Sequence, residues 1–442
     1  MHLFAAGSNA KGQLATGDDE DAHSFRLCKF LVAGKEVVDV PGSIIVKVVA
    51  GANHSVALLE NPATLQRSLW GAGDGSNGQL GPRFRHSSEP HNVYHPLDIP
   101  LPNEQCSIRD VCAAWETSFI RVRDGTTGSD CILSFGSNDH GMLGLAPGVD
   151  PRDVHVVDFT SMGYEGKEVA LFITGTRTAY ALTKDFCVAQ TRNILVGWGA
   201  SRRNQLTVTS GGPTTTQTKH PVSITIPQEI QLPQDSEIES IAAGFQHALL
   251  LTTSGRLLGL GSNNKGQLGV STSVVPEAGN PSSIGATWNS SFILDESRQT
   301  FFACGSNNHG QLGGVLGPQS VATVSLPDGF VVDSWVCGSE HVLVLARSVT
   351  IHLQRYRISY LVLFRLLTCF LRHRNSALEQ KLFGWGWNEH GNMGLGHTED
   401  VMTPTVIPIP SRSIPSATIE TDSPKIVGPW AGCGTSWFAL GS

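Results

Sequence analysis

Two short motifs alternate along this 442-residue chain, and their repetition constrains the fold more than any other feature. The first motif, of the form GSNNHGQLG, occurs seven times, with its leading glycine at positions 7, 73, 136, 199, 261, 305 and 386. The second motif, of the form AGANHSVAL, also occurs seven times, near residues 50, 113, 174, 243, 287, 337 and 431. A period of this size, in a chain of short apolar runs and glycine turns, indicates a propeller or a solenoid.

Each motif has a local physical interpretation. In the copy at 305–313, the first glycine ends the apolar run TFFAC, and the following Ser-Asn pair can hydrogen-bond to its own backbone. The second glycine, Gly310, supplies a positive φ, and Leu312 then turns inward. The second motif is a turn that enters a short apolar strand. Because no ordinary amphipathic helix interrupts the repeats, we expect a predominantly β chain.

The alternation of AGxxHxxAL with WGxNxxGQLG resembles the repeat of the regulator of chromosome condensation family. The resemblance covers nearly the whole chain and implies an all-β, seven-bladed β-propeller. It implies much less about function, because this propeller hosts exchange factors, scaffolds and inhibitors.

The order of the motifs predicts how the ring closes. The chain begins inside the strand before the first motif and ends just after the second, so half a blade stands at each terminus. Pairing these halves removes two free sheet edges. We therefore expect a single domain over residues 1–442 with blades at about 44–100, 106–160, 167–228, 237–280, 283–327 and 330–409, and a last blade made of 424–442 with 1–40.

Composition limits the partners. Lysine and arginine number 31 and aspartate and glutamate 38, so the net charge is −7 and direct nucleic-acid binding is not favoured. A strand starting at residue 2 leaves no room for a signal peptide. The nine scattered cysteines predict free thiols in a reducing compartment. We expect a monomer or heterodimer without a cofactor and away from membranes, in the cytoplasm, with the nucleus as a second location.

One segment, residues 349–376, departs from the repeat pattern. With its flanks it carries six arginines, and its apolar run from Tyr360 to Leu371 spans 12 residues, too short for a membrane span of ~20 residues. It could be a disordered loop, a basic amphipathic helix, or a translated intron. The intron interpretation is favoured for two reasons. The repeat sequences on either side of the segment join smoothly without it, and its removal shortens the interval between the sixth and seventh copies of the first motif to an ordinary repeat length.

Catalytic and cofactor motifs have simpler explanations here. GDGSNG at 73–78 matches a dinucleotide-binding fingerprint but is a copy of the repeat turn. His54, His247 and His341 share one position of the second motif, which holds Thr117, Thr178 and Thr435 elsewhere. A polar side chain that bonds a neighbouring backbone explains this position better than a metal site. No enzyme active site is expected.

Candidate partner-binding residues lie in and beside the motif turns. Tryptophan next to a polar or charged loop residue is the composition of an interface hot spot. By contrast, Trp70, Trp198 and Trp385 share the strand position before the first-motif glycine and are interpreted as blade packing. The partner-binding candidates are Trp115, Glu116, Trp288, Asn289, Trp387, Glu389, His390 and Trp437.

The runs WETS, TWNSSF and GWGWNEHGN, with the short opening segment, narrow the resemblance to the fungal alpha-tubulin suppressor branch of the family. That branch implies a non-enzymatic scaffold that binds a small CSL-type zinc protein and serves tRNA wobble-uridine modification and diphthamide formation. The alternative is a guanine-nucleotide exchange factor for a Ran-like small GTPase. The acidic charge and the lack of a basic N-terminal arm argue against that alternative.

Overall fold

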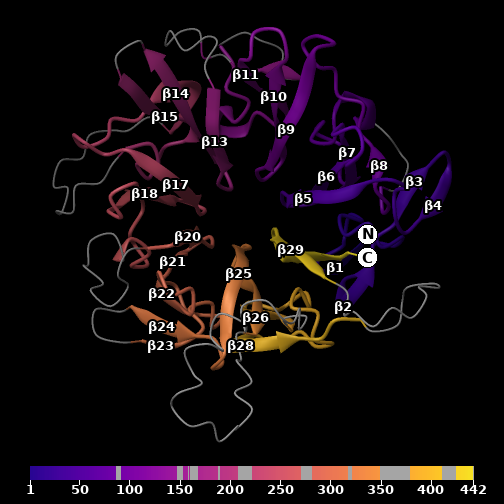
Figure 1. Ribbon diagram of the computed structural model, residues 1–442, viewed down its shortest axis with the longest axis vertical. Helices are drawn as coiled ribbons and strands as arrows, with labels where there is room; N and C mark the ends of the chain where they lie inside the picture. Colours follow the sequence, from indigo (N-terminus) through magenta and orange to yellow (C-terminus); the bar gives the residue numbers. More distant parts are fainter. Residues whose placement is uncertain are drawn as a thin grey trace, which may run out of the picture.

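The chain folds into a ring of seven antiparallel sheets (Figure 1). The inner strands of the ring line a cavity at its centre, which we call the central channel. The computed structural model describes residues 1–85, 91–146, 153–157, 159, 168–187, 190–207, 222–269, 281–316, 321–348, 379–410 and 425–441. The segment 349–376 lies outside the described residues. Within the described part of the chain, no helix is long and apolar enough to cross a membrane.

Each blade is an antiparallel meander whose first strand lies innermost (Figure 1). Blade 1 comprises β5 (Ile44–Ala50), β6 (His54–Glu60), β7 (Arg67–Gly73) and β8 (His95–Pro96). Blade 2 comprises β9 (Cys106–Ala113), β10 (Thr117–Asp124), β11 (Asp130–Gly136) and β12 (His155–Val156). Blade 3 comprises β13 (Glu168–Thr174), β14 (Thr178–Cys187), β15 (Gln190–Ala200) and β16 (Ser223–Glu229).

The next three blades also begin with the innermost strand, but in blade 5 β24 lies between β22 and β23. Blade 4 comprises β17 (Ile238–Ala243), β18 (His247–Thr252) and β19 (Leu257–Gly261). Blade 5 comprises β20 (Ser283–Ala286), β21 (Ser290–Leu294), β22 (Thr300–Gly305), β23 (Val315–Leu316) and β24 (Ala322–Ser325). Blade 6 comprises β25 (Phe330–Cys337), β26 (His341–Ser348), β27 (Gln380–Gly386) and β28 (Val401–Ile407). Two short 3₁₀ turns, η1 (Pro82–Phe84) and η2 (Asp139–Gly141), follow β7 and β11.

The last blade is composite, and the predicted closure of the ring is confirmed. Its strand order is β2–β1–β30–β29, with β29 (Ile426–Ala431) and β30 (Thr435–Leu440) from the C-terminus and β1 (His2–Gly7) and β2 (Ala22–Leu27) from the N-terminus. β1 and β30 pair in register from His2–Leu440 to Gly7–Thr435, so the two termini lie side by side (Figure 1).

The hydrophobic core consists of clusters between neighbouring blades. Trp198 of blade 3, for example, is fully buried and packs on Phe172 of its own blade and Phe119 of blade 2. The interpretation of Trp70, Trp198 and Trp385 as blade packing is confirmed. The seven cysteines whose state is described are free thiols, as expected.

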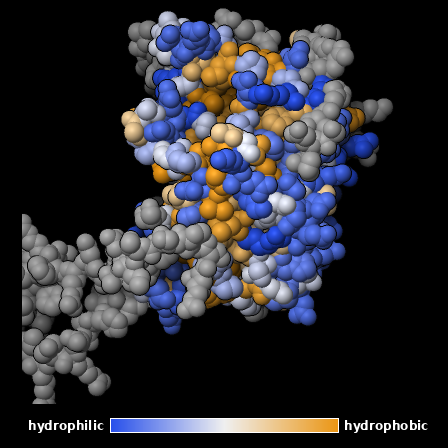
Figure 2. Space-filling model, turned by 90° about the vertical axis from the view of Figure 1, so that its right-hand side faces the viewer, coloured by the Kyte–Doolittle hydropathy of each residue, from blue (hydrophilic) through white to orange (hydrophobic). Residues whose placement is uncertain are grey.

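The rim beside blade 1 carries a small extra sheet, β3 (Phe30–Val32) with β4 (Lys35–Val37), which the sequence did not predict. Val32 and Val37 pack against the cluster between the closing blade and blade 1. Figure 2 shows this rim edge-on, with a band of hydrophobic surface between two hydrophilic margins.

The first-motif turn is fixed by its own side chains, as expected. In blade 5, Asn307 Oδ1 accepts the Leu312 N–H at 3.0 Å, and Gln311 Oε1 accepts the His309 N–H at 2.8 Å. Gly310 has a φ of 69°, and Leu312 is fully buried. The degenerate copy in blade 3 keeps the same backbone, because Asn204 takes a φ of 63° where the other copies have glycine.

Candidate functional site

The second-motif loops surround one mouth of the central channel. Each loop joins the innermost strand of a blade to the next strand, so all seven lie on the same face of the ring. The ends of the seven inner strands and their loops line a cavity of about 320 Å³. Side chains from distant parts of the sequence therefore converge at the channel mouth.

Backbone hydrogen bonds connect these loops from blade to blade, which fixes their positions relative to one another. The sequence offers no hint of these bonds, because the partners lie 43 to 93 residues apart. The bonds are Ala52 N–H to Trp115 O (2.8 Å), Trp115 N–H to Thr176 O (3.0 Å), Phe245 N–H to Trp288 O (3.0 Å), Trp288 N–H to Ser339 O (2.6 Å) and Ser339 N–H to Gly432 O (3.1 Å).

Three histidines at one shared position of the second motif also connect neighbouring blades. The Nε2 atoms of His54, His247 and His341 lie 3.0, 3.0 and 3.1 Å from serine hydroxyls of the following blade. Burial lowers the pKa of each of these histidines to about 4, so they are neutral at pH 7. The serine partners are Ser118, Ser291 and Ser436.

The expected role of this position is confirmed in part. Thr117 bonds a backbone carbonyl, that of Ser137, at 2.7 Å. The histidines contact a serine hydroxyl of the next blade, and the backbone of Ser290 and of Thr435 also hydrogen-bonds His247 and His341 respectively. Within the described residues, no group of three or more His, Cys, Asp or Glu side chains could hold a metal ion.

Four side chains from four blades form a closed cluster at the channel mouth, which we call the mouth cluster. Trp288 of blade 5 contacts Trp115 of blade 2 (ring centroids 6.0 Å) and Phe245 of blade 4 (6.1 Å). The guanidinium of Arg177, from blade 3, lies over the rings of both Trp115 and Phe245, with its Cζ 6.0 Å and 5.8 Å from the two ring centroids. All four side chains are partly exposed. The sequence prediction that Trp115 and Trp288 belong to one face is consistent with this geometry.

Carboxylates lie beside the mouth cluster. Burial raises the pKa of Glu116, and the carboxylates of Asp139 and Asp74 raise it further, whereas Arg177 opposes them. Asp74 belongs to the first motif of blade 1 and Asp139 to that of blade 2. The blade 1 and 2 side of the mouth is therefore acidic, while Arg177 places a positive charge inside the aromatic cluster.

Asn289, the residue after Trp288, is held by a buried carboxylate from the next blade. Its Nδ2 donates to Glu340 Oε1 at 2.6 Å. Glu340 Oε2 accepts from Gln311 Nε2 at 3.0 Å and from the Thr287 hydroxyl at 3.3 Å. Burial raises the pKa of Glu340, although the hydrogen bonds from Asn289, Gln311 and Thr287 lower it.

Trp387, Glu389 and His390 lie together in the first-motif turn of blade 6. The Trp387 indole N–H donates to Glu389 Oε2 at 3.2 Å, and its ring meets the His390 ring edge-on at 5.3 Å. His390 Nδ1 lies 2.7 Å from Asp21 Oδ2 of the closing blade. His390 therefore connects two blades, and Glu389 is the exposed member of the group.

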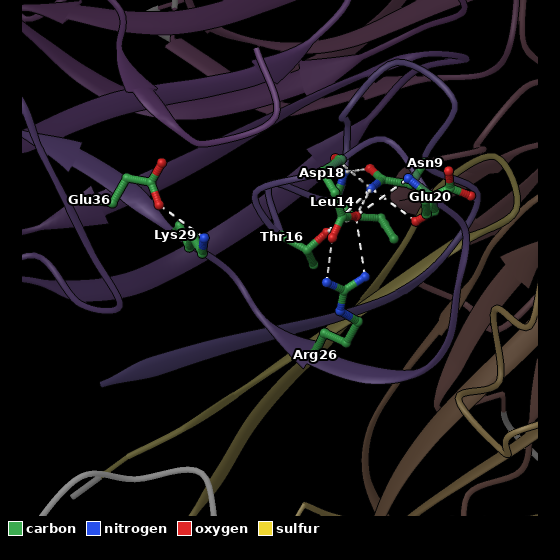
Figure 3. Close-up of polar contacts among 8 residues, drawn as sticks. All are labelled: Asn9, Leu14, Thr16, Asp18, Glu20, Arg26, Lys29 and Glu36. Atoms are coloured by element: carbon green, nitrogen blue, oxygen red, sulfur yellow. Dashed lines mark hydrogen bonds and ion pairs between the residues drawn. The ribbon is translucent and has the colours of Figure 1, made fainter. Parts of the chain in front are cut away.

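Asp21 belongs to an acidic loop, residues 17–23, whose backbone carbonyls and carboxylates hold Asn9 of the first motif of the closing blade (Figure 3). Asn9 Oδ1 accepts the Leu14 N–H at 2.9 Å, and Asn9 Nδ2 donates to Asp18 O at 2.9 Å and to Glu20 O at 3.2 Å. Asp18 forms a salt bridge with Arg26. These contacts give the acids of the loop a structural role.

The prediction for Trp437 is wrong. Its side chain has no exposed surface and belongs to the core between the closing blade and blade 1. It lies on β30, which is flanked by β1 and β29, and every residue from Thr435 to Leu440 is buried. One face of β30 packs in the core cluster shared with blade 6 and the other, which carries Trp437, in the cluster shared with blade 1, so no partner can reach this indole.

Sequence reasoning missed Arg177, Phe245 and Glu340. A signal was present, because Phe245 occupies the motif position of Trp115 and Trp288, and Arg177 and Glu340 occupy that of Glu116 and Asn289. Aligning the seven copies position by position would have included them.

Comparison with known proteins agrees with the repeat pattern. The family model described as "Regulator of chromosome condensation (RCC1) repeat" matches residues 238–267 and residues 379–420. The chain therefore carries RCC1 repeats on a seven-bladed propeller, and we refer to it below as the RCC1-repeat propeller. It is 28% identical over 431 residues to the mouse (Mus musculus) secretion-regulating guanine nucleotide exchange factor, covering 93% of this chain and 80% of that protein.

Solved structures support the RCC1-repeat propeller fold. The crystal structure of human WBSCR16 matches with a TM-score of 0.69 and 16% identity over 100% of both chains. Yeast RCC1 (Prp20), solved bound to Kap60, matches with a TM-score of 0.64 and 17% identity over 100% of this chain and 89% of the other. These likenesses concern the fold, and they do not place the RCC1-repeat propeller in the alpha-tubulin suppressor branch.

Proposed function

We propose that this RCC1-repeat propeller is a non-catalytic protein-binding platform whose partner docks on the channel mouth. The observation that carries the proposal is the mouth cluster, in which Trp115, Arg177, Phe245 and Trp288 converge from four blades while remaining partly exposed. Tryptophan and arginine are the residues most enriched at the energetic centre of protein interfaces.

The loops that carry the cluster are suited to this task because they are already ordered. The inter-loop hydrogen bonds hold Trp115 and Trp288 through their backbone N–H groups, at 3.0 and 2.6 Å. A partner that docks on such loops loses little ordering entropy, so more of the contact energy appears as affinity.

The relatives favour a small GTPase as the partner. The mouse relative, which aligns over 93% of this chain, is named a guanine nucleotide exchange factor. We therefore propose a Ran-like small GTPase as the partner to be tested first, with nucleotide exchange as the consequence of binding. The acidic side of the mouth, around Glu116, would face basic residues of the GTPase.

A nucleotide-release assay tests this assignment. Purified protein is added to a Ran-type GTPase loaded with a fluorescent guanine nucleotide, and release is followed over time. Accelerated release that is lost in Trp288→Ala and retained in Glu296→Gln, a variant in the exposed hairpin between β21 and β22, supports exchange at the mouth. Release at the intrinsic rate with all proteins rejects the exchange function.

A scaffold function on a small CSL-type zinc protein is the second candidate, with roles in tRNA wobble-uridine modification and diphthamide formation. It is favoured by the runs WETS and TWNSSF, whose tryptophans meet at the mouth cluster. A pull-down with a purified CSL-type zinc protein tests it, and Trp115→Ala should lose the interaction. A cytoplasmic location, with the nucleus as a second one, accompanies both candidates.

A further inference from the structure

Glu340 stands between the two groups of candidate partner-binding residues. Its carboxylate accepts hydrogen bonds from Asn289 and Thr287, the residues on either side of Trp288. Its backbone carbonyl accepts the Trp387 N–H at 2.9 Å. The preceding residue, Ser339, accepts the Trp288 N–H through its carbonyl at 2.6 Å. Residues 339 and 340 of blade 6 thus bond the backbone of Trp288 and of Trp387, and the Glu340 carboxylate also bonds the two sequence neighbours of Trp288.

The environment of Glu340 is unusual for a carboxylate. The residue is 7% exposed, and the three donors that reach its oxygens, from Asn289, Gln311 and Thr287, are all neutral. Burying a carboxylate is costly unless its hydrogen bonds are well made. Because its charge is buried, the Glu340 carboxylate forms strong hydrogen bonds with these three donors, and these bonds fix the orientation of the donor side chains.

The equivalent position of blade 2 gives a natural comparison. Glu116 occupies the same place in the second motif and follows a tryptophan of the mouth cluster, but it is partly exposed. Glu340 instead points into the junction with blade 5 and is hydrogen-bonded to three side chains there. The two glutamates thus share a motif position, but only the carboxylate of Glu340 is buried against hydrogen-bond donors of the neighbouring blade.

We propose that Glu340 is a positioning residue for the docking surface: its carboxylate holds Thr287 and Asn289 and thereby sets the orientation of Trp288 at the channel mouth. The part of the proposal that concerns partner affinity rests on the proposed function. The part that concerns Trp288 does not, because the orientation of the indole is a property of the free protein.

The first experiment measures Trp288 in the free protein. Acrylamide quenching of tryptophan fluorescence is compared for wild type, Glu340→Ala and Asn289→Ala, each with and without Trp288→Phe. Both variants should raise the quenching constant when Trp288 is present and leave it unchanged in the Trp288→Phe background. An equal change in both backgrounds, or no change in either, overturns the positioning role. Asn289→Ala keeps the test available if Glu340→Ala does not fold.

Glu340→Gln separates hydrogen-bond geometry from charge. The carbonyl of the introduced glutamine can still accept from Gln311 and Thr287, and the Asn289 amide can turn over to accept from the glutamine NH₂ group. Quenching near the wild-type value is therefore expected for Glu340→Gln. If Glu340→Gln behaves like Glu340→Ala, positioning by hydrogen bonds is wrong. Glu116→Gln is the matched control and should not alter the Trp288-dependent quenching.

The second experiment measures affinity for the Ran-type GTPase. Glu340→Ala should weaken binding by roughly tenfold, the effect expected for losing hydrogen bonds to a charged group, while Glu340→Gln restores it. If quenching changes as expected but no variant, nor the wild type, binds the GTPase, the proposed partner is wrong and the positioning role stands. If the wild type binds and Glu340→Ala binds equally well, the link from Glu340 to docking is wrong.

Discussion

At the scale of single residues, the buried histidines show how much one side chain can contribute to blade stacking. Ser118 donates its only hydroxyl proton to Gln79 O at 2.7 Å, so His54 must donate to Ser118 from Nε2. The His54 ring also lies against Gly51, where an added Cβ would come within 2.4 Å of Cε1. The glycine of the second motif is thus required wherever the motif carries histidine.

This arrangement predicts a specific pH dependence of stability. The folded-state pKa of His54, His247 and His341 is about 4, below the ordinary value of 6.5, so the unfolded state binds more protons between these values. Each histidine should lower the free energy of unfolding by about 1.4 kcal/mol per pH unit as the pH falls from 6.5 towards 4. Glu340, whose pKa burial raises, acts in the opposite direction.

Urea denaturation at pH 7, 6 and 5 measures the effect. His247→Thr, which installs the residue used by other blades, should show a shallower pH dependence together with a lower stability at pH 7. A wild-type free energy of unfolding that does not change between pH 7 and pH 5 would show that the histidines are not held neutral.

The sequence located some residues of the candidate site and not others, for physical reasons. Trp115 and Trp288 lie in loops, where a large apolar side chain beside a polar or charged residue is conspicuous. Trp437 has similar neighbours in the sequence, but it lies on a central strand that is buried on both faces. Glu340 acts through Asn289, 51 residues away, and only the stacking of blades 5 and 6 brings the two together.

At the scale of elements, the first-motif turn is a self-contained unit and was predictable. Asn307→Ala should lower the free energy of unfolding by about 1–3 kcal/mol, because the Leu312 N–H loses its acceptor inside the turn. Chemical denaturation measures this change. Asn308→Ala, at the exposed neighbouring position, is the control and should stay within ~0.5 kcal/mol of wild type. Equal effects at both positions would contradict the role of the Asn307 side chain.

The strands that flank residues 349–376 also support a prediction. Ser348 N–H donates to Glu379 O at 2.9 Å, and Arg347 pairs with Gln380, so the chain leaves and re-enters blade 6 at adjacent points. Deleting 349–376 leaves residues 377 and 378 to join the hairpin, a length that two-residue turns commonly span. We expect an unchanged melting temperature and higher solubility, because the run YLVLF is removed.

Two measurements test this segment separately. Thermal melting and sedimentation of the deletion variant test its dispensability, and a collapse of cooperative melting would show that the propeller needs it. Sequencing the mature messenger tests the intron hypothesis, which fails if the transcript encodes the segment.

At the scale of the whole molecule, the closing blade decides whether the ring is stable. Seven copies of two motifs, offset by half a blade, predicted the composite sheet that β1 and β30 form. Removing residues 1–16 deletes β1 and exposes the edge of β30, so the truncated chain should unfold or aggregate. A truncated protein that melts cooperatively near the wild-type temperature would contradict this role. A circular permutant that joins the adjacent termini should remain folded.

The proposed docking depends on the whole ring, since the four side chains of the mouth cluster come from four blades. Titration calorimetry of wild type, Trp115→Ala and Trp288→Ala with the purified partner, first a Ran-type GTPase and then a CSL-type zinc protein, tests this most directly. We predict an affinity at least about 30-fold weaker for Trp288→Ala, with a melting temperature within ~2 °C of wild type. Affinity equal to wild type in both variants, or affinity lost only in proportion to a fall in melting temperature, would contradict docking at the channel mouth.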